Sequence, residues 1–360
     1  MKKFHLTAGP SELYFTVEQH IQQALKENVA VISHRSGAFQ EIFSFTVKQV
    51  KEMLGVPEDY HVVFTGSATE VWERLAQDCI AQKSAHFVNG SFSERFHAFA
   101  EAWGHQTQKI EKPLGEGFSE EDFKIDVDVD LISITQNETS TGVQFPVEDI
   151  YKIREENPEA LITVDAVSSI PYLEIDFTKI DSLYFSVQKG MGCPAGLGVW
   201  IFNEKCVDRA KTLKAEGRLM GGYHDMFTLL KNASKNMTPA TPNAIAIYTL
   251  GKVCEDMIRR EMKIIRSESD YKSSLLYAAV GAHKDLDYAV KEERVRSKTV
   301  IVIEVKEGRD AKDLMAYLSV QGLEVSTGYG PKKATQVRIA NFPTISKEVY
   351  FRLVDLIEAW

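Results

Sequence analysis

The fold is decided by residues 161–198, LITVDAVSSIPYLEIDFTKIDSLYFSVQKGMGCPAGLG. This stretch contains two short apolar runs, 161–164 and 183–187, whose composition predicts buried parallel strands. Asp165 follows the first run and Lys189 follows the second. Open α/β sheets bind ligands beyond the carboxyl ends of their strands. We therefore expect an acid and an amine to face each other across one crevice.

The neighbours of these two residues favour a ligand site. An isolated Asp after a strand is commonly a turn or cap residue, and an isolated Lys is commonly a solvated charge. Here Gln188 precedes Lys189, four glycines follow within nine residues, and Ser168 lies close after Asp165. Glycines let a backbone approach a ligand closely. Pyridoxal phosphate would use the amine to bind its aldehyde and the carboxylate to keep its ring nitrogen protonated.

The phrases VDAVSS and SVQKG resemble those of the class V, fold-type I aminotransferases. The resemblance implies Lys189 as the Schiff-base lysine and Asp165 as the partner of the pyridine nitrogen, both catalytic. It also implies an α/β fold, with a mostly parallel central sheet in a large domain and a small C-terminal α+β domain. We expect the large domain over 15–255, and the small domain over 1–14 together with 256–360.

Further cofactor residues come from strand–loop–helix patterns along the chain. The loop Gly-Ser-Ala-Thr before a predicted helix presents N–H groups that attract an anion. The resemblance implies that Ser67, Ala68 and Thr69 hold the cofactor phosphate. It places Phe92 against the pyridine ring, where phosphoserine aminotransferases usually have Trp, and it assigns the phenolic oxygen to Thr139 of the phrase NETSTG.

A turn-rich segment, residues 217–243, shows little periodicity and is expected to be a functional loop. Thr238 and Thr241 within it are similar to a family phrase that crosses the dimer interface and binds the other subunit's cofactor phosphate. Met237 stands where the family has Asn. The resemblance therefore implies a homodimer with active sites at the subunit interface.

Four residues are expected to contact the substrate. His34 and Arg35 are similar to a Ser-His-Arg phrase of phosphoserine aminotransferases that reaches the neighbouring subunit's site and holds the substrate phosphate. A guanidinium fork beside an imidazole suits a phosphate. By the same resemblance, Arg338 binds the α-carboxylate, and Gly9 lies at the mouth of the site.

The choice of substrate stays open at this level. The phosphoserine aminotransferase hypothesis predicts transfer of an amino group from glutamate to 3-phosphohydroxypyruvate, giving phosphoserine and 2-oxoglutarate. However, Lys332 and Lys333 stand where some phosphoserine enzymes carry a His-Arg pair, and NETSTG resembles serine or alanine:glyoxylate aminotransferases equally well. A cysteine desulfurase would need a nucleophilic cysteine in a loop well beyond Lys189, and no cysteine follows Cys254. A nucleotide-binding α/β protein would need a Gly-x-Gly-x-x-Gly or Walker loop, which the sequence lacks.

Composition narrows the class of protein. A chain of 360 residues suits one large and one smaller domain. A net charge of −9 argues against nucleic acid as the main partner, because nucleic-acid binding needs a basic face. Four scattered cysteines without metal spacing predict reduced thiols, no bound metal and a cytoplasmic location. No apolar run suggests a signal peptide or a membrane span. The expected partners are a small amino acid and a 2-oxo acid.

The rest of the chain reads as alternating helices and strands. One long helix over 242–266 is expected to link the two domains. The elements expected after it are a strand over 298–305, a helix over 310–321, a strand over 335–340 and a helix over 346–358.

Overall fold

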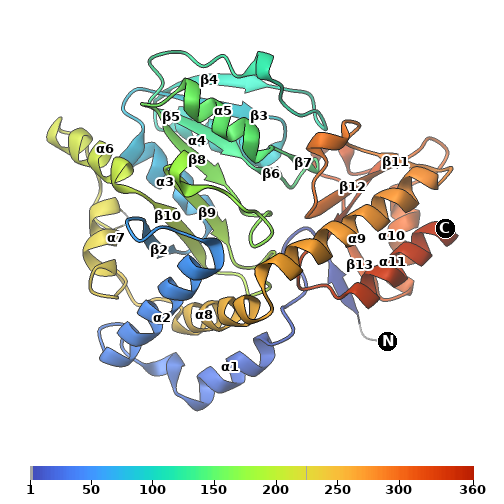
Figure 1. Ribbon diagram of the computed structural model, residues 1–360, viewed down its shortest axis with the longest axis horizontal. Coiled ribbons are helices and arrows are strands. Elements are labelled where there is room, and N and C mark those ends of the chain that lie inside the picture. Colours follow the sequence, from blue (N-terminus) through green and yellow to red (C-terminus); the bar gives the residue numbers. More distant parts are fainter. Residues whose placement is uncertain (1–2, 224) are drawn as a thin grey trace.

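The computed structural model describes residues 3–223 and 225–360, and its larger part surrounds a seven-stranded sheet (Figure 1). In the order in which they pair, the strands are β2 (His61–Thr65), β10 (Gly198–Phe202), β9 (Ser182–Ser186), β8 (Leu161–Asp165), β5 (Leu131–Thr135), β3 (Lys83–Val88) and β4 (Gln106–Glu111). Only β10 runs antiparallel to its two neighbours. The predicted mostly parallel sheet is confirmed.

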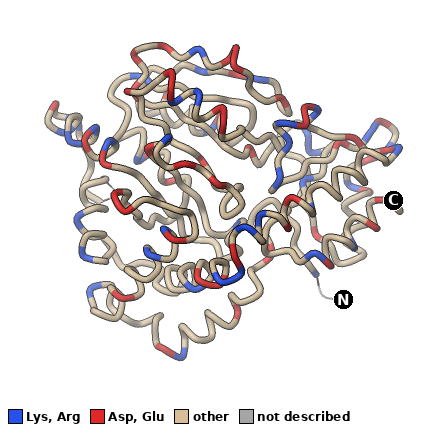
Figure 2. Tube along the Cα trace, in the orientation of Figure 1, with Lys and Arg blue, Asp and Glu red and all other residues tan. Residues whose placement is uncertain are grey.

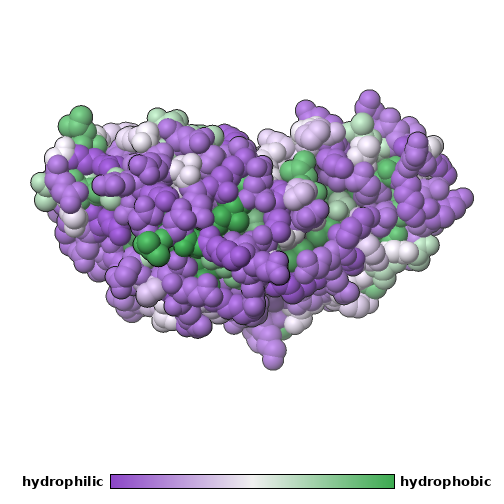
Figure 3. Space-filling model, turned by 90° about the horizontal axis from the view of Figure 1, so that it is seen from above, coloured by the Kyte–Doolittle hydropathy of each residue, from purple (hydrophilic) through white to green (hydrophobic). Residues whose placement is uncertain are grey.

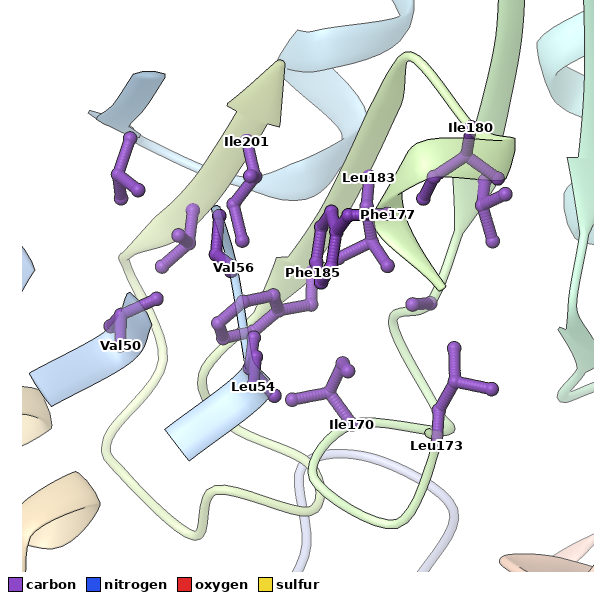
Figure 4. Packing of buried hydrophobic residues seen from close by; sticks show 14 of the residues in the cluster. Val50, Leu54, Val56, Ile170, Leu173, Phe177, Ile180, Leu183, Phe185 and Ile201 are labelled. Carbon is purple, nitrogen blue, oxygen red and sulfur yellow. The ribbon is translucent and has the colours of Figure 1, made fainter. Parts of the chain in front are cut away.

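The two strands expected from the apolar runs, β8 and β9, are parallel neighbours and are buried along their whole length. Successive side chains of a strand point to opposite faces. Accordingly Leu183 and Phe185 enter one core cluster while Tyr184 enters another. Figure 4 shows Leu183 and Phe185 packed with Ile170, which comes from the loop after β8. A strand that is apolar on both sides must be covered by helices on both faces.

Two groups of helices provide that cover. The first packs in the core cluster that contains Phe185 and consists of α2 (Gly37–Leu54), α5 (Val147–Glu156) and α8 (Ala244–Arg259). The second packs in the cluster that contains Tyr184 and consists of α3 (Ala68–Cys79), α4 (Ser91–Ala102), α6 (Glu204–Ala215) and α7 (Met226–Ala233). Helix α1 (Val17–Lys26) lies outside α8, as Figure 1 shows. The result is a three-layer α/β arrangement.

A second sheet of five strands has its own core. Its strands in pairing order are β1 (Phe4–Leu6), β13 (Leu323–Thr327), β14 (Gln336–Ala340), β12 (Val300–Val305) and β11 (Leu286–Tyr288). The helices that pack against it are α9 (Met262–Ala282), α10 (Ala311–Val320) and α11 (Lys347–Ala359). Strand β1 therefore joins the C-terminal part of the chain, as Figure 1 shows in blue beside orange and red. The domain boundaries stay a prediction.

The single helix predicted over 242–266 is wrong. The structure has two helices, α8 and α9, separated at Arg260 and Glu261. Glu261 has φ 66°, a conformation that a residue with a Cβ adopts only under strain. The apolar spacing continues across the break, so periodicity alone did not reveal it.

The segment predicted as a loop over 217–243 contains α7. Its N-cap, Asp225, accepts a hydrogen bond from the backbone N–H of Thr228 at 3.0 Å. Asp78 of α3 accepts another from the N–H of Met226 at 2.9 Å. Since Asp78 is far away in the sequence, this part of the helix depends on a tertiary contact. Strands β11 and β13 and the short pair β6 (Asn137–Glu138) and β7 (Val143–Gln144) were not predicted either.

The surface is mixed in charge, and Figure 2 shows Lys and Arg interspersed with Asp and Glu along the trace. Seen from above in Figure 3, a notch separates the two parts of the molecule, and apolar residues are visible at its sides. Among residues 3–223 and 225–360, no helix combines the length and the apolar character that crossing a membrane requires.

The break at Glu261 generates a stability prediction. We expect Glu261→Gly to raise the free energy of unfolding by about 1 kcal/mol, because glycine relieves the strain of a positive φ and the gain exceeds its entropy cost. Thermal unfolding followed by circular dichroism measures the change. Glu261→Ala is the matched control, since it removes the carboxylate and keeps the Cβ. A glycine variant no more stable than the alanine variant would contradict the strain explanation.

Candidate active site

A cavity of about 240 Å³ lies at the carboxyl ends of β8 and β9, where the sequence predicts chemistry. Asp165 is the last residue of β8, and Lys189 lies three residues beyond the end of β9. The structure brings nine of the predicted site residues to this one cavity: Gly9, Ala68, Thr69, Phe92, Thr139, Asp165, Gln188, Lys189 and Arg338. They come from both sheets, so the cavity lies between the two parts of the molecule.

Lys189 is a buried amine with one short polar contact. Its side chain is 7% exposed, and its Nζ donates a hydrogen bond to Thr139 Oγ1 at 3.1 Å. The same Nζ lies 5.2 Å from the ring centroid of Phe92. Burial lowers the pKa of Lys189 to about 8; the charge of Asp165 opposes this shift and that of Arg338 adds to it. The neutral, nucleophilic amine is therefore accessible near neutral pH.

Gly9 is close to the side chain of Lys189. A Cβ at position 9 would lie 2.7 Å from Lys189 Cε and 3.1 Å from its Cγ, and the backbone has φ 137°. Any other residue would collide with the lysine and strain its own backbone. The predicted place of Gly9 at the mouth of the site thus has a steric reason.

Asp165 is a buried carboxylate that faces the same cavity. It is 5% exposed, and burial raises its pKa to about 6 despite the N–H of Val167, which donates to Oδ1 at 3.0 Å. Behind it, the hydroxyl of Tyr184 accepts a hydrogen bond from Trp72 Nε1 at 2.8 Å. A buried carboxylate gains most from a cationic partner, such as a protonated ring nitrogen.

The beginning of α3 carries the three residues that the sequence predicts to hold the cofactor phosphate. Ser67 caps the helix by accepting from the N–H of Glu70 at 3.3 Å, and the N–H of Ala68 donates to Ser186 Oγ at 2.9 Å. Ala68 and Thr69 line the cavity at this positive helix end. A Cβ at Gly198 would lie 2.5 Å from the carbonyl carbon of Ser67, so glycine at 198 lets the loop pack against β10.

Arg338 enters the cavity from β14 of the second sheet. Its Nε donates to the carbonyl of Thr327 at 2.8 Å, and its Nη1 donates to the carbonyl of Thr139 at 3.0 Å. Its guanidinium carbon also lies 5.2 Å from the ring centroid of Tyr329. These contacts fix the orientation of the guanidinium, a group that binds carboxylates through two parallel N–H donors.

Six predicted residues do not line this cavity. Ser67 immediately precedes Ala68, which does line the cavity. Ser168 accepts a hydrogen bond from Asn137 Nδ2 at 2.7 Å. Thr238 and Thr241 line a separate pocket of about 270 Å³, to which Gly66 also contributes. The last two residues are His34 and Arg35.

His34 and Arg35 lie at the surface. His34 Nδ1 is 3.4 Å from Thr241 Oγ1, and Arg35 is exposed. Within one chain, therefore, the residues expected to act in the neighbouring subunit's site do not line the cavity that contains Lys189. His34 instead lies beside Thr241.

Sequence reasoning missed several residues that line the cavity. Nothing in the sequence marked Trp72 and Ser186 as site residues, because each lies in a stretch whose pattern core packing explains. Tyr329 lies near Arg338, which was predicted to contact the substrate. However, a short turn that the sequence predicts to be a surface loop follows Tyr329 directly. Its ring lies 5.7 Å from that of Phe92, so it closes the cavity between the two sheets.

These side chains fit pyridoxal phosphate. The group requires an amine for its aldehyde, an acid for its ring nitrogen, donors for its phosphate and a flat face for its ring. Lys189, Asp165, the N-terminus of α3 and Phe92 have those chemical characters and surround one cavity.

The model of the family described as Aminotransferase class-V matches residues 4–341. The chain belongs to the class V aminotransferase family. This membership explains why one cavity combines a buried lysine and a buried aspartate. It also confirms the resemblance that the VDAVSS and SVQKG phrases indicated, and with it a transaminase of the fold-type I architecture.

Individual relatives of this class V aminotransferase carry narrower names. A crystal structure of a phosphoserine aminotransferase, SerC from Cytophaga hutchinsonii, is 44% identical, with a TM-score of 0.97, and the match covers 99% of this chain and 98% of that one. Phosphoserine aminotransferases of Rhodococcus opacus and of a Nocardioides species are 28% and 26% identical, over 97% of this chain and 93% and 94% of theirs. An aspartate aminotransferase of Thermus thermophilus, 22% identical with a TM-score of 0.87, shares the fold.

The lowered pKa of Lys189 generates a prediction for the cofactor-free protein. The rate of covalent capture of pyridoxal phosphate should rise about tenfold per pH unit below pH 8 and level off above it, because only the neutral amine attacks the aldehyde. Stopped-flow absorbance, with borohydride trapping to identify the modified lysine, measures this rate.

Nα-acetyl-lysine, which keeps a free ε-amine, is the control for the cofactor's own titration. Lys189→Ala is the control for capture by other lysines. A rate that kept rising towards pH 10.5, the ordinary value for lysine, would contradict the lowered pKa.

Proposed function

We propose that this class V aminotransferase uses pyridoxal phosphate to move an amino group from glutamate to 3-phosphohydroxypyruvate, giving 2-oxoglutarate and phosphoserine. The observation that carries the aminotransferase chemistry is the buried Lys189 beside the buried Asp165 in one cavity. The phosphorylated substrate is supported by the relative that is 44% identical over nearly the whole chain and is named for that activity.

Pyridoxal phosphate, when bound, supplies a ring that accepts the electrons released when the substrate Cα loses its proton. In the proposed reaction, Lys189 Nζ would take up the proton of the substrate Cα and would return it to the carbon that was the cofactor's aldehyde. Its hydrogen bond to Thr139 Oγ1 holds the amine at the cavity wall. Asp165 and Phe92 line the same cavity. Asp165 would keep the ring nitrogen protonated, and Phe92 would pack against the ring.

Arg338 is assigned to the substrate α-carboxylate. Because Thr327 and Thr139 already hold its Nε and Nη1, the guanidinium needs little further ordering to bind a carboxylate. One arginine can serve both halves of the reaction, since the amino acid and the 2-oxo acid each carry a carboxylate at this position.

The substrate phosphate is assigned to His34 and Arg35 of a second copy of the chain, in a homodimer. Two observations support this assignment. Both residues lie outside the cavity of their own chain, and His34 contacts Thr241, which is proposed with Thr238 to reach the other cofactor phosphate.

We further propose a role in serine biosynthesis in the cytoplasm. Phosphoserine is one hydrolysis away from serine. The four cysteines, Cys79, Cys193, Cys206 and Cys254, are buried and free, which suits a compartment where thiols stay reduced. None of them lines the cavity that contains Lys189, and this favours transamination over cysteine desulfuration.

Arg35→Ala tests the phosphate assignment. We expect KM for phosphoserine to rise by about tenfold to a hundredfold with little change in kcat, because one charge-assisted contact to the substrate is lost. KM for unphosphorylated serine should stay unchanged in the same variant, which makes the second substrate an internal control. Steady-state kinetics with both substrates provides the measurement.

A different result would support a different substrate. If the parent protein used serine or alanine with glyoxylate as well as it uses phosphoserine, and if Arg35→Ala affected all substrates alike, the phosphoserine assignment would be wrong. The aminotransferase assignment would survive that outcome, because it depends on Lys189 and Asp165.

A further inference from the structure

Glu138 is a fully buried carboxylate beside the cavity that does not line it. It is 0% exposed, and it lies in the short strand β6, next to Thr139. A buried ion costs several kcal/mol unless it is well paired. The contacts that surround Glu138 therefore indicate what its burial achieves.

Both oxygens of Glu138 accept hydrogen bonds, and the donors come from two separate segments. From the start of α4, the N–H of Phe92 donates to Oε2 at 3.1 Å, while the N–H and Oγ of Ser93 donate to it at 2.9 Å each. From the turn after β6, the N–H and Oγ of Ser140 donate to Oε1 at 3.0 and 2.6 Å. The negative charge also suits the positive end of α4. Glu138 thus ties α4 to the turn over 139–142.

Gly90 is shaped by the same carboxylate. A Cβ at position 90 would lie 2.3 Å from Glu138 Cγ, 2.5 Å from its Cδ and 2.5 Å from Ser140 Oγ. Only glycine lets the backbone before α4 approach the buried side chain this closely. The loop, the helix start and the turn are therefore packed around one carboxylate.

The two segments joined by Glu138 carry two walls of the cavity. Phe92, whose N–H binds Glu138, presents its ring 5.2 Å from Lys189 Nζ. Thr139, which directly follows Glu138, accepts the hydrogen bond of that Nζ and also binds Arg338 through its carbonyl. A shift of α4 against the turn would change the distance between the ring of Phe92 and the hydroxyl of Thr139.

We propose that Glu138 is a positioning residue that fixes Phe92 and Thr139 relative to each other, so that the cofactor ring is held at one angle to Lys189. This inference rests on the proposed use of pyridoxal phosphate, and it does not depend on the identity of the substrate. Glu138 acts through its neighbours, and its contribution is the relative placement of the helix and the turn.

Glu138→Gln tests the proposal with little change in size. Both oxygens accept backbone N–H groups, so a carboxamide must direct its NH₂ at Ser140 N–H or at the N–H groups of Phe92 and Ser93. We expect the Kd for pyridoxal phosphate to rise about tenfold to a hundredfold. We also expect the visible circular dichroism of the bound cofactor to weaken, since this signal reports a fixed ring orientation.

Asp181→Asn is the matched control. Asp181 is 2% exposed, accepts from the N–H of Ile162 at 2.8 Å and from Asn203 Nδ2 at 2.9 Å, and pairs with Arg154. It lies just before β9, at the opposite end of that strand from Lys189. Its loss should lower thermal stability while leaving the Kd and the visible dichroism unchanged.

The proposal is overturned if Glu138→Gln binds pyridoxal phosphate with parental affinity and dichroism, or if Asp181→Asn alters both as strongly. If Glu138→Gln does not fold, the double variant Ser93→Ala with Ser140→Ala removes two donors and keeps the carboxylate; unchanged Kd and dichroism there would also overturn it. A parent protein that captured no cofactor would instead refute the proposed function.

Discussion

The structure depends on one constraint, the burial of an amine at the carboxyl edge of the large sheet. Lys189 lies three residues beyond the end of β9, and it is 7% exposed. Desolvation keeps the amine closer to its neutral form than it would be in water. The same burial leaves no room for a side chain at position 9. The reactivity of the lysine and the shape of the cavity therefore have one physical origin.

Thr139 connects this amine to the second sheet. Its hydroxyl accepts from Lys189 Nζ and its carbonyl accepts from Arg338, which lies on β14. Strand β14 is anchored in turn by Asn341, whose Nδ2 donates to the carbonyl of Ser269 on α9 at 2.7 Å and to that of Lys298 at 2.8 Å. The position of Arg338 thus depends on contacts well outside the cavity.

The sequence predicted those parts of the site that local pattern determines. Asp165 and Lys189 follow short apolar runs that favour buried parallel strands, so their place at one edge of the sheet was predictable from topology. Glu138 was missed because its neighbours in space come from residues 90–93, about 45 positions earlier. The break at Glu261 was missed because a single strained residue leaves the apolar spacing intact. Helix α7 was missed because part of its cap comes from Asp78.

Charge balance links the cavity to the proposed second copy. Among the described residues that line it, the basic side chains are Lys189 and Arg338, and the acidic one is Asp165. A cofactor phosphate and a substrate carrying both a carboxylate and a phosphate would add several negative charges to this partly desolvated space. In the proposed function Arg338 would balance the carboxylate, and the start of α3 would contribute only partial charge. The substrate phosphate then needs a cation from elsewhere, which is why an exposed Arg35 outside its own cavity is consistent with a site completed by a neighbouring chain.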